Sequence, residues 1–281
     1  MKLEPLKTFN IFYNPKNKKS VLLAKDLSMF IADKFPALKK DLKSPAYVIV
    51  LGGDGTILEA ARRYKNNGSI IAGLNMGTVG FLASARNEKN FQRALSTLFK
   101  GKINITERLM ISARVIRERK IVFQCDALNE AVIKNLLGIV ELQASVEDHP
   151  IQYIRGEGIL VSTATGSTAY NLSAHGPIVM PGIRCLIVTE LMDHNIPTPS
   201  IVISYEKKIK IRVINFRKRG RLSFAKTGQE VDVVLSADGE SIFGLEPGDE
   251  IIIESSSSLI KFAELEKNYF FKSLEEKFGF K

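Results

Sequence analysis

Apolar residues in the first third of the chain form short unbroken runs, and these runs alternate with segments of helical periodicity. The runs predict three buried strands: Thr8–Tyr13, Tyr47–Leu51 and Ile70–Leu74. Apolar spacing of three and four residues predicts three helices: Val21–Phe35, Ile57–Tyr64 and Asn90–Phe99. This strand-helix rhythm predicts a parallel sheet with helices on both of its faces.

The periodicity changes to two near Asn104 and stays so to about Ser255. Basic and apolar residues alternate from Lys208 to Val213, as a half-exposed antiparallel strand requires. Turn signals recur at Arg219-Gly220, Asp238-Gly239 and Pro247-Gly248. The four residues Ser255–Ser258 are typical of a linker, and the helical spacing of Phe271, Leu274 and Phe278 predicts a short final helix.

The sequence therefore predicts three parts. Residues 1–103 form an α/β domain with a Rossmann-like parallel sheet, and residues 104–255 form an antiparallel β-sandwich-like domain. Residues 256–281 form a C-terminal segment that docks back on the N-terminal domain.

Composition narrows the class of protein. The 281 residues include no apolar run of 18 or more and no signal peptide, so we expect a cytoplasmic protein without a membrane partner. Two distant cysteines, Cys125 and Cys185, are typical of reduced core thiols. The net charge of +10 comes from short basic clusters, such as Arg217-Lys218-Arg219, that are not interleaved with aromatic residues. We therefore interpret most of the excess charge as solvated surface and expect no nucleic-acid partner; a polyanionic small substrate can use the remainder.

The segment Gly52-Gly53-Asp54-Gly55-Thr56 follows one predicted strand and precedes a helix. Ligands bind at this end of parallel strands, where glycines let backbone amides approach phosphate oxygens. A carboxylate among phosphates is repulsive unless it holds a metal or accepts a proton. The structural alternative is a capped turn in which Asp54 only bonds backbone amides. The strand-turn-helix context and the glycines on both sides of Asp54 favour a functional role for this residue instead.

Three further segments carry polar groups with less specific signals. The loop Asn75–Leu82 again places glycines after a parallel strand, although a plain βα connection explains it nearly as well. The segment Thr163–Ser173 is rich in hydroxyl and amide groups that suit ribose and phosphate, and the alternative is a capped polar turn. The pair Asn129-Glu130 lies between apolar residues, which fits either a binding role or an internal hydrogen-bond network.

In their order along the chain, these four segments resemble those of the bacterial NAD kinases, which phosphorylate the 2′-hydroxyl of the adenosine ribose of NAD to give NADP. The first segment alone is also similar to lipid kinases of the diacylglycerol type and to phosphofructokinases. The combination with Gly166-Ser167-Thr168-Ala169-Tyr170 is more specific, and the resemblance extends over essentially the whole chain.

The resemblance implies an ATP-dependent transferase, with polyphosphate as the donor of some relatives, that binds NAD between its domains and forms homodimers or homotetramers. It implies that Asp54 is the general base. It places the following residues around NAD: Gly53, Asp54, Gly55, Asn75, Phe81, Asn129, Glu130, Arg155, Glu157, Thr168, Ala169, Tyr170 and Ser173. We expect the phosphate donor to bind the loop that contains Asp54, at the residues Gly52, Gly53, Gly55 and Thr56.

The chain departs from the family at several positions. Glu157 stands where the family usually has aspartate, His175 stands where it has glycine, and Thr189–His194 differs from the family's Thr-Pro-Ile…Pro-His run. The three histidines have no zinc-like spacing, so we expect no metal cage made by the protein and Mg²⁺ that arrives with ATP.

Two other functions stay open at this point. A lipid or sugar kinase shares the first motif but does not need the polar loop Thr165–Ser173. A non-catalytic sensor of NAD or NADP needs that loop but gains nothing from a proton acceptor at Asp54.

Overall fold

The computed structural model describes residues 8–77, 80–83, 85–194, 198–225 and 227–279, and the chain divides into two compact units. Unit 1 contains the residues up to Arg108 and those from Ser258 onward, and unit 2 is Leu109–Ser257. The sequence analysis placed the corresponding boundaries at 103/104 and 255/256.

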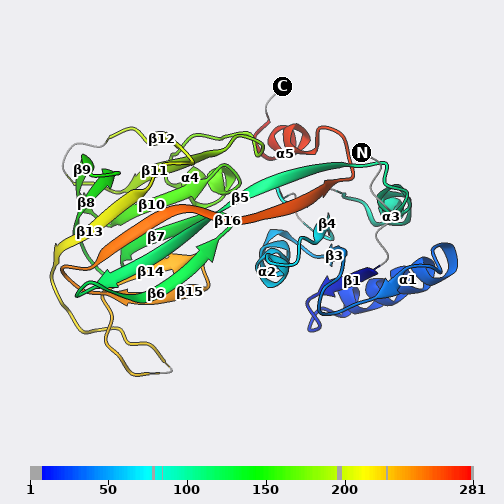
Figure 1. Cartoon of the computed structure of the whole chain (residues 1–281), viewed down its shortest axis with the longest axis horizontal. Coiled ribbons are helices and arrows are strands. Elements are labelled where there is room, and N and C mark those ends of the chain that lie inside the picture. Colours follow the sequence, from blue (N-terminus) through cyan, green and yellow to red (C-terminus); the bar gives the residue numbers. More distant parts are fainter. Residues whose placement is uncertain (1–7, 78–79, 84, 195–197, 226, 280–281) are drawn as a thin grey trace. The chain divides into compact units, whose positions relative to one another are not determined.

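Unit 1 contains a parallel sheet in the order β2-β1-β3-β4-β16 (Figure 1). Two long strands, β5 (Asn104–Arg117) and β16 (Glu250–Glu264), have residues in both units. The other elements of unit 1 are β1 (Thr8–Tyr13), α1 (Lys18–Lys34), β2 (Lys39–Lys40), β3 (Tyr47–Leu51), α2 (Asp54–Tyr64), β4 (Ile70–Leu74), the 3-10 helix η1 (Glu88–Asn90), α3 (Phe91–Phe99) and α5 (Tyr269–Phe278).

Helices cover both faces of this sheet, as the sequence predicts. Phe9 and Ile11 of β1 join a core with buried residues of α1 and α3. The alternate residues Asn10 and Phe12 face the other way, because successive side chains of a strand point to opposite faces. There they contact Tyr64 of α2, by a 2.8 Å hydrogen bond from Asn10 and an edge-on ring contact with Phe12.

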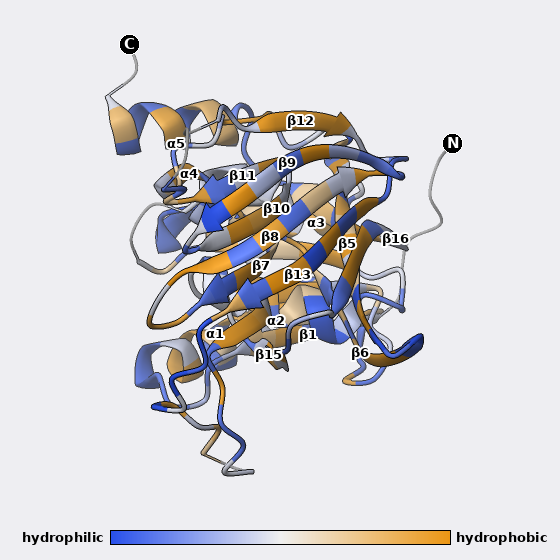
Figure 2. Ribbon diagram, turned by 90° about the vertical axis from the view of Figure 1, so that its left-hand side faces the viewer, coloured by the Kyte–Doolittle hydropathy of each residue, from blue (hydrophilic) through white to orange (hydrophobic). Residues whose placement is uncertain are grey.

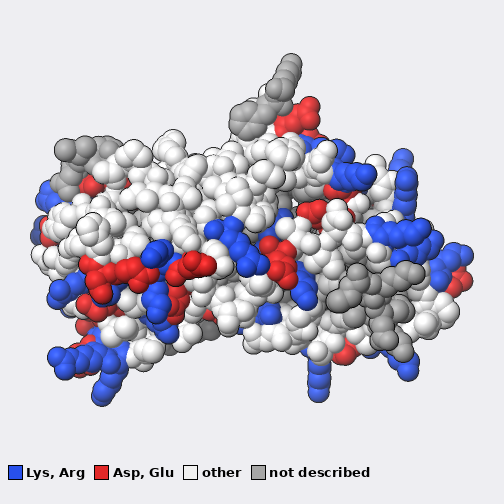
Figure 3. Space-filling model, turned by 45° about the horizontal axis from the view of Figure 1, so that its top comes forward, with Lys and Arg blue, Asp and Glu red and all other residues white. Residues whose placement is uncertain are grey.

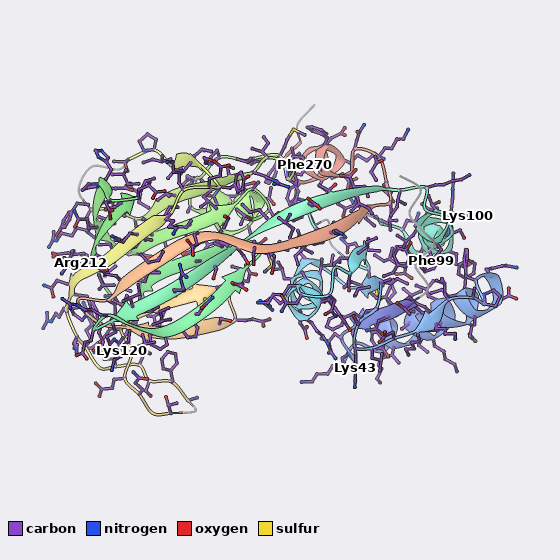
Figure 4. The ribbon with its side chains drawn as sticks, viewed as in Figure 1. Lys43, Phe99, Lys100, Lys120, Arg212 and Phe270 are labelled. Carbon is purple, nitrogen blue, oxygen red and sulfur yellow. The ribbon has the colours of Figure 1, made fainter. Side chains whose placement is uncertain are left out.

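Aromatic rings close the core between α3 and the sheet. Phe99 at the end of α3 contacts Phe9 of β1, Tyr47 of β3 and Phe35 after α1, with ring centroids 6.4, 5.4 and 5.1 Å away (Figure 4). All three pairs are edge-to-face, the arrangement that the ring quadrupole favours. These contacts hold α3 and α1 against the same side of the sheet.

Unit 2 contains two antiparallel sheets. One has the order β12-β11-β10-β7-β14-β15. The other has the order β6-β5-β16-β13-β8-β9. The elements are β6 (Lys120–Ala127), β7 (Glu130–Asn135), β8 (Val140–Val146), β9 (His149–Gly156), β10 (Gly158–Thr163), η2 (Gly166–Thr168), α4 (Tyr170–Ser173), β11 (Cys185–Leu191), β12 (Ile201–Ser204), β13 (Ile209–Phe216), β14 (Val233–Ala237) and β15 (Ser241–Leu245).

The two sheets pack face to face, which confirms the sandwich-like arrangement. Strands β8 and β9 contact β10, and β6 contacts β14. Apolar and polar residues alternate along β13, and Figure 2 shows this alternation in colour. Ile209, Ile211 and Val213 are fully buried, so one face of the strand builds the core and the other meets solvent.

The interpretation of Ser255–Ser258 as a linker is wrong. These serines lie inside β16, which runs without a break from Glu250 to Glu264. Ile251–Ile253 pair with β13, and Lys261 and Phe262 pair with β4. Serine is frequent in loops, but a strand with partners at both ends tolerates it because the sheet satisfies the backbone.

One glycine determines how closely the loop after β4 approaches α2. A Cβ on Gly73 would lie 2.7 Å from Cδ1 of Ile57 and 2.8 Å from Cα of Ala83. The second contact is to backbone, which cannot move without shifting the loop. We expect Gly73→Ala to lower the free energy of unfolding by about 1–3 kcal/mol, measured by urea denaturation. Gly182→Ala is the control, since an added Cβ there has no neighbour within 4 Å; equal stability of both variants would contradict the prediction.

Candidate functional site

The glycine-rich segment lies at the carboxyl end of β3 and opens helix α2. The helix begins at Asp54, three residues earlier than predicted, with Gly53 at the N-cap and therefore no side chain to bond the first-turn amides. Gly52 donates its N–H to the carbonyl of Leu74, 3.2 Å away, which ties this turn to the end of β4. A Cβ on Gly52 would lie 2.6 Å from Oγ1 of Thr56, so glycine permits the tight turn.

The Asp54 carboxylate is held by the loop that follows β4. The N–H of Phe81 donates to Oδ2 at 2.9 Å, and the N–H of Leu82 donates to Oδ1 at 3.2 Å. Gly80 leaves room for this approach, because a Cβ there would lie 2.1 Å from Oδ1. A carboxylate has about four lone-pair positions, so each oxygen of this half-buried group can still accept another hydrogen bond.

Helix α5 fastens the same loop from its other side. The buried Ser273 hydroxyl donates to the carbonyl of Gly80 at 2.9 Å, and it accepts from Nη2 of Arg86 at 2.6 Å. The Arg86 guanidinium also lies 4.4 Å from the ring centroid of Tyr269. The backbone that bonds Asp54 is therefore anchored to the last helix of the chain.

Phe81 has two roles in this arrangement. Its backbone N–H bonds Asp54, and its side chain packs against α5. Its ring is buried and lies 5.9 Å from that of Phe270 and 6.2 Å from that of Phe278, both on α5 (Figure 4). Asn75, also buried, accepts the N–H of Gly77 on its side-chain oxygen at 2.8 Å. Thr78 and Val79 of the predicted loop lie outside the described residues.

In unit 2, Asn129 and Glu130 lie beside a carboxylate that binds their backbone. Oδ1 of Asp238 accepts the N–H of Asn129 at 2.8 Å and that of Glu130 at 3.3 Å, and Oδ2 accepts the N–H of Leu128 at 2.9 Å. Asp238 and Gly239, the first two residues of the three-residue turn between β14 and β15, both have positive φ, 47° and 73°.

Glu130 has a raised pKa, and one of its buried oxygens has no hydrogen-bond partner among the described residues. Burial, together with the charge of Asp238, raises the pKa of Glu130 to about 8, although the backbone N–H of Tyr170 hydrogen-bonds to it. Oε2 of Glu130 and Oδ1 of Asn129 are buried and have no hydrogen-bond partner among the described residues. Such atoms fit a ligand that brings its own hydrogen-bonding groups.

The polar segment after β10 lies against this pair. A Cβ on Gly166 would lie 2.3 Å from the carbonyl oxygen of Asn129, and Thr163 donates its N–H to the same oxygen at 2.8 Å. Thr168 and Ala169 follow Gly166 in and just after η2, and Tyr170 opens α4. The structure thus brings the third and fourth predicted segments together.

Beside this segment is a cavity of about 490 Å³, within the range of small-molecule sites. Glu157, Tyr170 and Ser173 line it, together with His175 and most of the segment from Thr189 to Ser200. Nζ of Lys134 forms an ion pair with Glu157 at 3.0 Å. The segment Thr189–His194, which departs from the family pattern, therefore lies at the same cavity as Glu157.

Arg155 lies apart from the other predicted residues. It lines a different hollow, with Arg217 and Arg219, and its Nε lies 3.5 Å from Oε1 of Glu141. The separation arises because Gly156 ends β9 and Gly158 begins β10, so Glu157 sits at the break between two strands.

Three positions escape the sequence analysis. Asp238 was recognised only as part of a turn signal, and the segment that it binds lies more than 100 residues earlier. Lys134 carries a signal, since it is the one charged residue after Glu130 in the mostly buried strand β7 and directly follows the apolar run Ala131–Ile133. Ser273 carries none, because its partner Gly80 is 193 residues away in sequence.

The described residues contain no group of three or more His, Cys, Asp or Glu that could hold a metal ion. Nor does any helix among them have both the length and the hydropathy to span a membrane. On the face shown in Figure 3, Lys and Arg side chains form several separate groups with Asp and Glu between them.

Two family models match the chain: the ATP-NAD kinase N-terminal domain over residues 11–103 and the ATP-NAD kinase C-terminal domain over residues 128–265. The chain is 35% identical over 235 residues to an NAD kinase of Lachnoclostridium phytofermentans, covering 82% of this chain and 79% of that protein. It is 33% identical over 242 residues to a bifunctional NADP phosphatase/NAD kinase of Methanocaldococcus jannaschii, covering 85% of this chain and 40% of that protein.

Two solved structures share the fold. Yeast NADH kinase complexed with NADH matches with a TM-score of 0.86 and 19% identity, over 99% of this chain and 89% of that one. An NAD kinase from Archaeoglobus fulgidus in complex with ATP matches with a TM-score of 0.74 and 22% identity, over 97% of both chains.

The raised pKa of Glu130 makes stability depend on pH. Its ordinary value is 4.5 and its value in the folded chain is about 8, so the folded state binds more protons in that window. The free energy of unfolding therefore falls as pH rises from about 4.5 to 8, by on the order of 3–5 kcal/mol from this group. We expect Glu130→Gln, which stays neutral, to flatten the slope in urea denaturation at several pH values. The exposed control Glu59→Gln should keep it; an unchanged slope in Glu130→Gln would count against the assignment.

Proposed function

Because the chain belongs to the ATP-NAD kinase family, we propose that it transfers the terminal phosphoryl group of ATP to the 2′-hydroxyl of the adenosine ribose of NAD, which gives NADP. The observation that carries the proposal is the arrangement around Asp54. A carboxylate with free lone pairs lies at the N-terminus of α2, in a turn whose cap residue has no side chain.

Asp54 is the general base in this proposal. Its carboxylate accepts the hydrogen of the ribose hydroxyl while that oxygen attacks the terminal phosphorus. The N–H groups of Phe81 and Leu82 hold the two carboxylate oxygens in one orientation, 2.9 and 3.2 Å from the nitrogens. A base fixed in this way loses little freedom when the reaction begins.

The backbone of Gly52–Thr56 binds the phosphates of the donor. First-turn amides and the dipole of α2 favour negative charge, and they stabilise the charge that spreads over phosphoryl oxygens in the transition state. Mg²⁺ enters as part of the Mg-ATP substrate and neutralises further charge. The support is local: a glycine N-cap and a turn tied to β4 through Gly52.

Both units supply groups that bind NAD in this proposal. Glu130 suits a ribose hydroxyl, because a carboxyl with a pKa of about 8 is largely protonated at neutral pH and can both donate and accept a hydrogen bond. The other contacts that we propose in unit 2 are Asn129, Thr168, Ala169, Tyr170, Ser173 and, in the place of the usual aspartate, Glu157. Those that we propose in unit 1 are Gly53, Asp54, Gly55, Asn75 and Phe81. Arg155 is a further proposed contact, although its side chain lines a different hollow from Glu157.

The remaining features of the proposal rest on the family alone. We propose a magnesium-dependent, cytoplasmic enzyme that assembles as a homodimer or homotetramer. ATP is the donor, and polyphosphate is an alternative donor.

A panel of substrates tests the activity. Purified protein is incubated with Mg-ATP and NAD, and NADP is detected with an NADP-specific dehydrogenase. NADH and diacylglycerol serve as other acceptors, and polyphosphate serves as another donor. NADP formation supports the proposal. Phosphorylated lipid without NADP would identify a lipid kinase, and tight NAD binding without any transfer would identify a sensor.

Removal of the proposed base gives a first prediction for activity. We expect Asp54→Asn to lower kcat by about 10²- to 10⁴-fold, because the amide cannot accept the proton, while NAD binding by calorimetry stays within about threefold. Glu59→Gln makes the same chemical change at an exposed position of α2 and should leave kcat unchanged. Full activity of Asp54→Asn would remove Asp54 from the mechanism.

Displacement of the base gives a second prediction. An added methyl group at Gly80 would overlap the Asp54 carboxylate, with Oδ1 only 2.1 Å away. We expect Gly80→Ala to lower kcat by about 10²-fold, since a displacement near 1 Å has an effect of that size. Gly77→Ala alters the same loop where an added Cβ has no neighbour within 4 Å, and it should retain activity. Equal kcat values for the two variants would show that the carboxylate position is unimportant.

A further inference from the structure

Three arginines of unit 2 line one hollow of about 330 Å³. Arg155 comes from β9, and Arg217 and Arg219 come from the segment directly after β13. Arg217 and Arg219 belong to a basic cluster of the sequence for which the proposed function has no use. The fold thus adds a third guanidinium, from a distant strand, to two neighbouring ones.

The charge in this hollow is poorly balanced. Glu141 is the single acidic residue of the lining, and it pairs with Arg155 at 3.5 Å. Within the described part of the chain, Arg217 and Arg219 form no ion pair. Positive groups gathered in a concave surface raise the local concentration of anions. Guanidinium groups bind phosphate oxygens in pairs, so the chemistry favours a phosphate-bearing anion.

The backbone holds Arg219 in place before any ligand binds. The buried Asp232 accepts the N–H of Arg219 on both oxygens, at 3.1 and 3.0 Å, and that of Gly220 at 3.4 Å. The guanidinium lies over Gly138, where an added Cβ would be 3.6 Å from Nε and from Nη2. These bonds fix the backbone of Arg219, and its exposed side chain reaches the hollow from that fixed position.

Another part of the lining, around Asn135, is held by hydrogen bonds of its own. The side chain of Asn135 donates to the carbonyl of Ile139 at 2.9 Å and accepts the N–H of Leu137 at 3.0 Å. Asn135, Gly138 and Ile139 also line a neighbouring hollow of about 350 Å³, which Glu157 and His194 share with the larger cavity described above. The arginines therefore lie next to that cavity without being part of it.

We propose that Arg155, Arg217 and Arg219 form a second anion site, which binds a small polyphosphate, either inorganic or as the phosphate chain of a nucleotide. This site consists of residues of unit 2, whereas the phosphate-binding loop Gly52–Thr56 belongs to unit 1, and its existence does not depend on the proposed activity.

Calorimetry of the full chain with inorganic tripolyphosphate and, separately, with ADP tests the proposal. We expect wild-type protein to bind at least one of the two with an affinity that falls roughly tenfold or more in R217A/R219A and falls less in Arg217→Ala alone. The probe with the larger loss identifies the inorganic or the nucleotide source. Lys218→Ala is the matched control: it removes the same charge from the same segment at a residue that does not line the hollow, and it should bind like the wild type.

Two results would overturn the proposal. If R217A/R219A bound both probes with wild-type affinity, the arginines would not form an anion site. If Lys218→Ala weakened binding as much as the double variant, the effect would be general attraction to a basic surface. Circular dichroism confirms that each variant is folded. If the first result is found, light scattering shows whether the arginines instead contact a second copy of the chain.

Discussion

Two hydrogen bonds from the backbone of Phe81 and Leu82 to the Asp54 carboxylate are the central interaction of unit 1. They join the loops that follow β3 and β4, two neighbouring parallel strands whose carboxyl ends share one edge of the sheet. Asp54 lies 27 residues before Phe81, so parallel pairing brings the two loops into register. Gly80 and Gly73 permit the close approach, and Ser273 fixes the loop from behind.

Unit 2 arranges its polar groups differently. Asp238 satisfies three consecutive backbone N–H groups, whereas the side chains of Asn129 and Glu130 each keep a buried oxygen without a hydrogen-bond partner among the described residues. Burying such groups lowers stability, and proteins keep them mainly where a ligand completes the hydrogen bonds. The negative charge of Asp238 is part of this arrangement, because it disfavours ionisation of Glu130. The unbonded side-chain oxygens of Asn129 and Glu130 thus lower the stability of the folded chain and at the same time are available to bind a ligand.

The features that the sequence predicted are those determined by neighbouring residues. The strand, turn and helix around Gly52–Thr56 follow from an apolar run and three glycines, and the Asp238-Gly239 turn follows from the positive φ that both residues tolerate. The features that it missed depend on distant partners. Ser255–Ser258 continue a strand because β16 has neighbours at both ends, and Arg155 separates from Glu157 because a strand break lies between them. No local periodicity carries that information.

The bond between Ser273 and Gly80 has a consequence for the newly made chain. Gly80 lies 193 residues before Ser273, so the ribosome makes the loop long before it makes the helix that holds the loop from behind. Until α5 has been translated, the loop has its strands and α2 but lacks the hydrogen bond from Ser273. A truncated product that ends before Ser273 therefore lacks this support for the loop that bonds the Asp54 carboxylate.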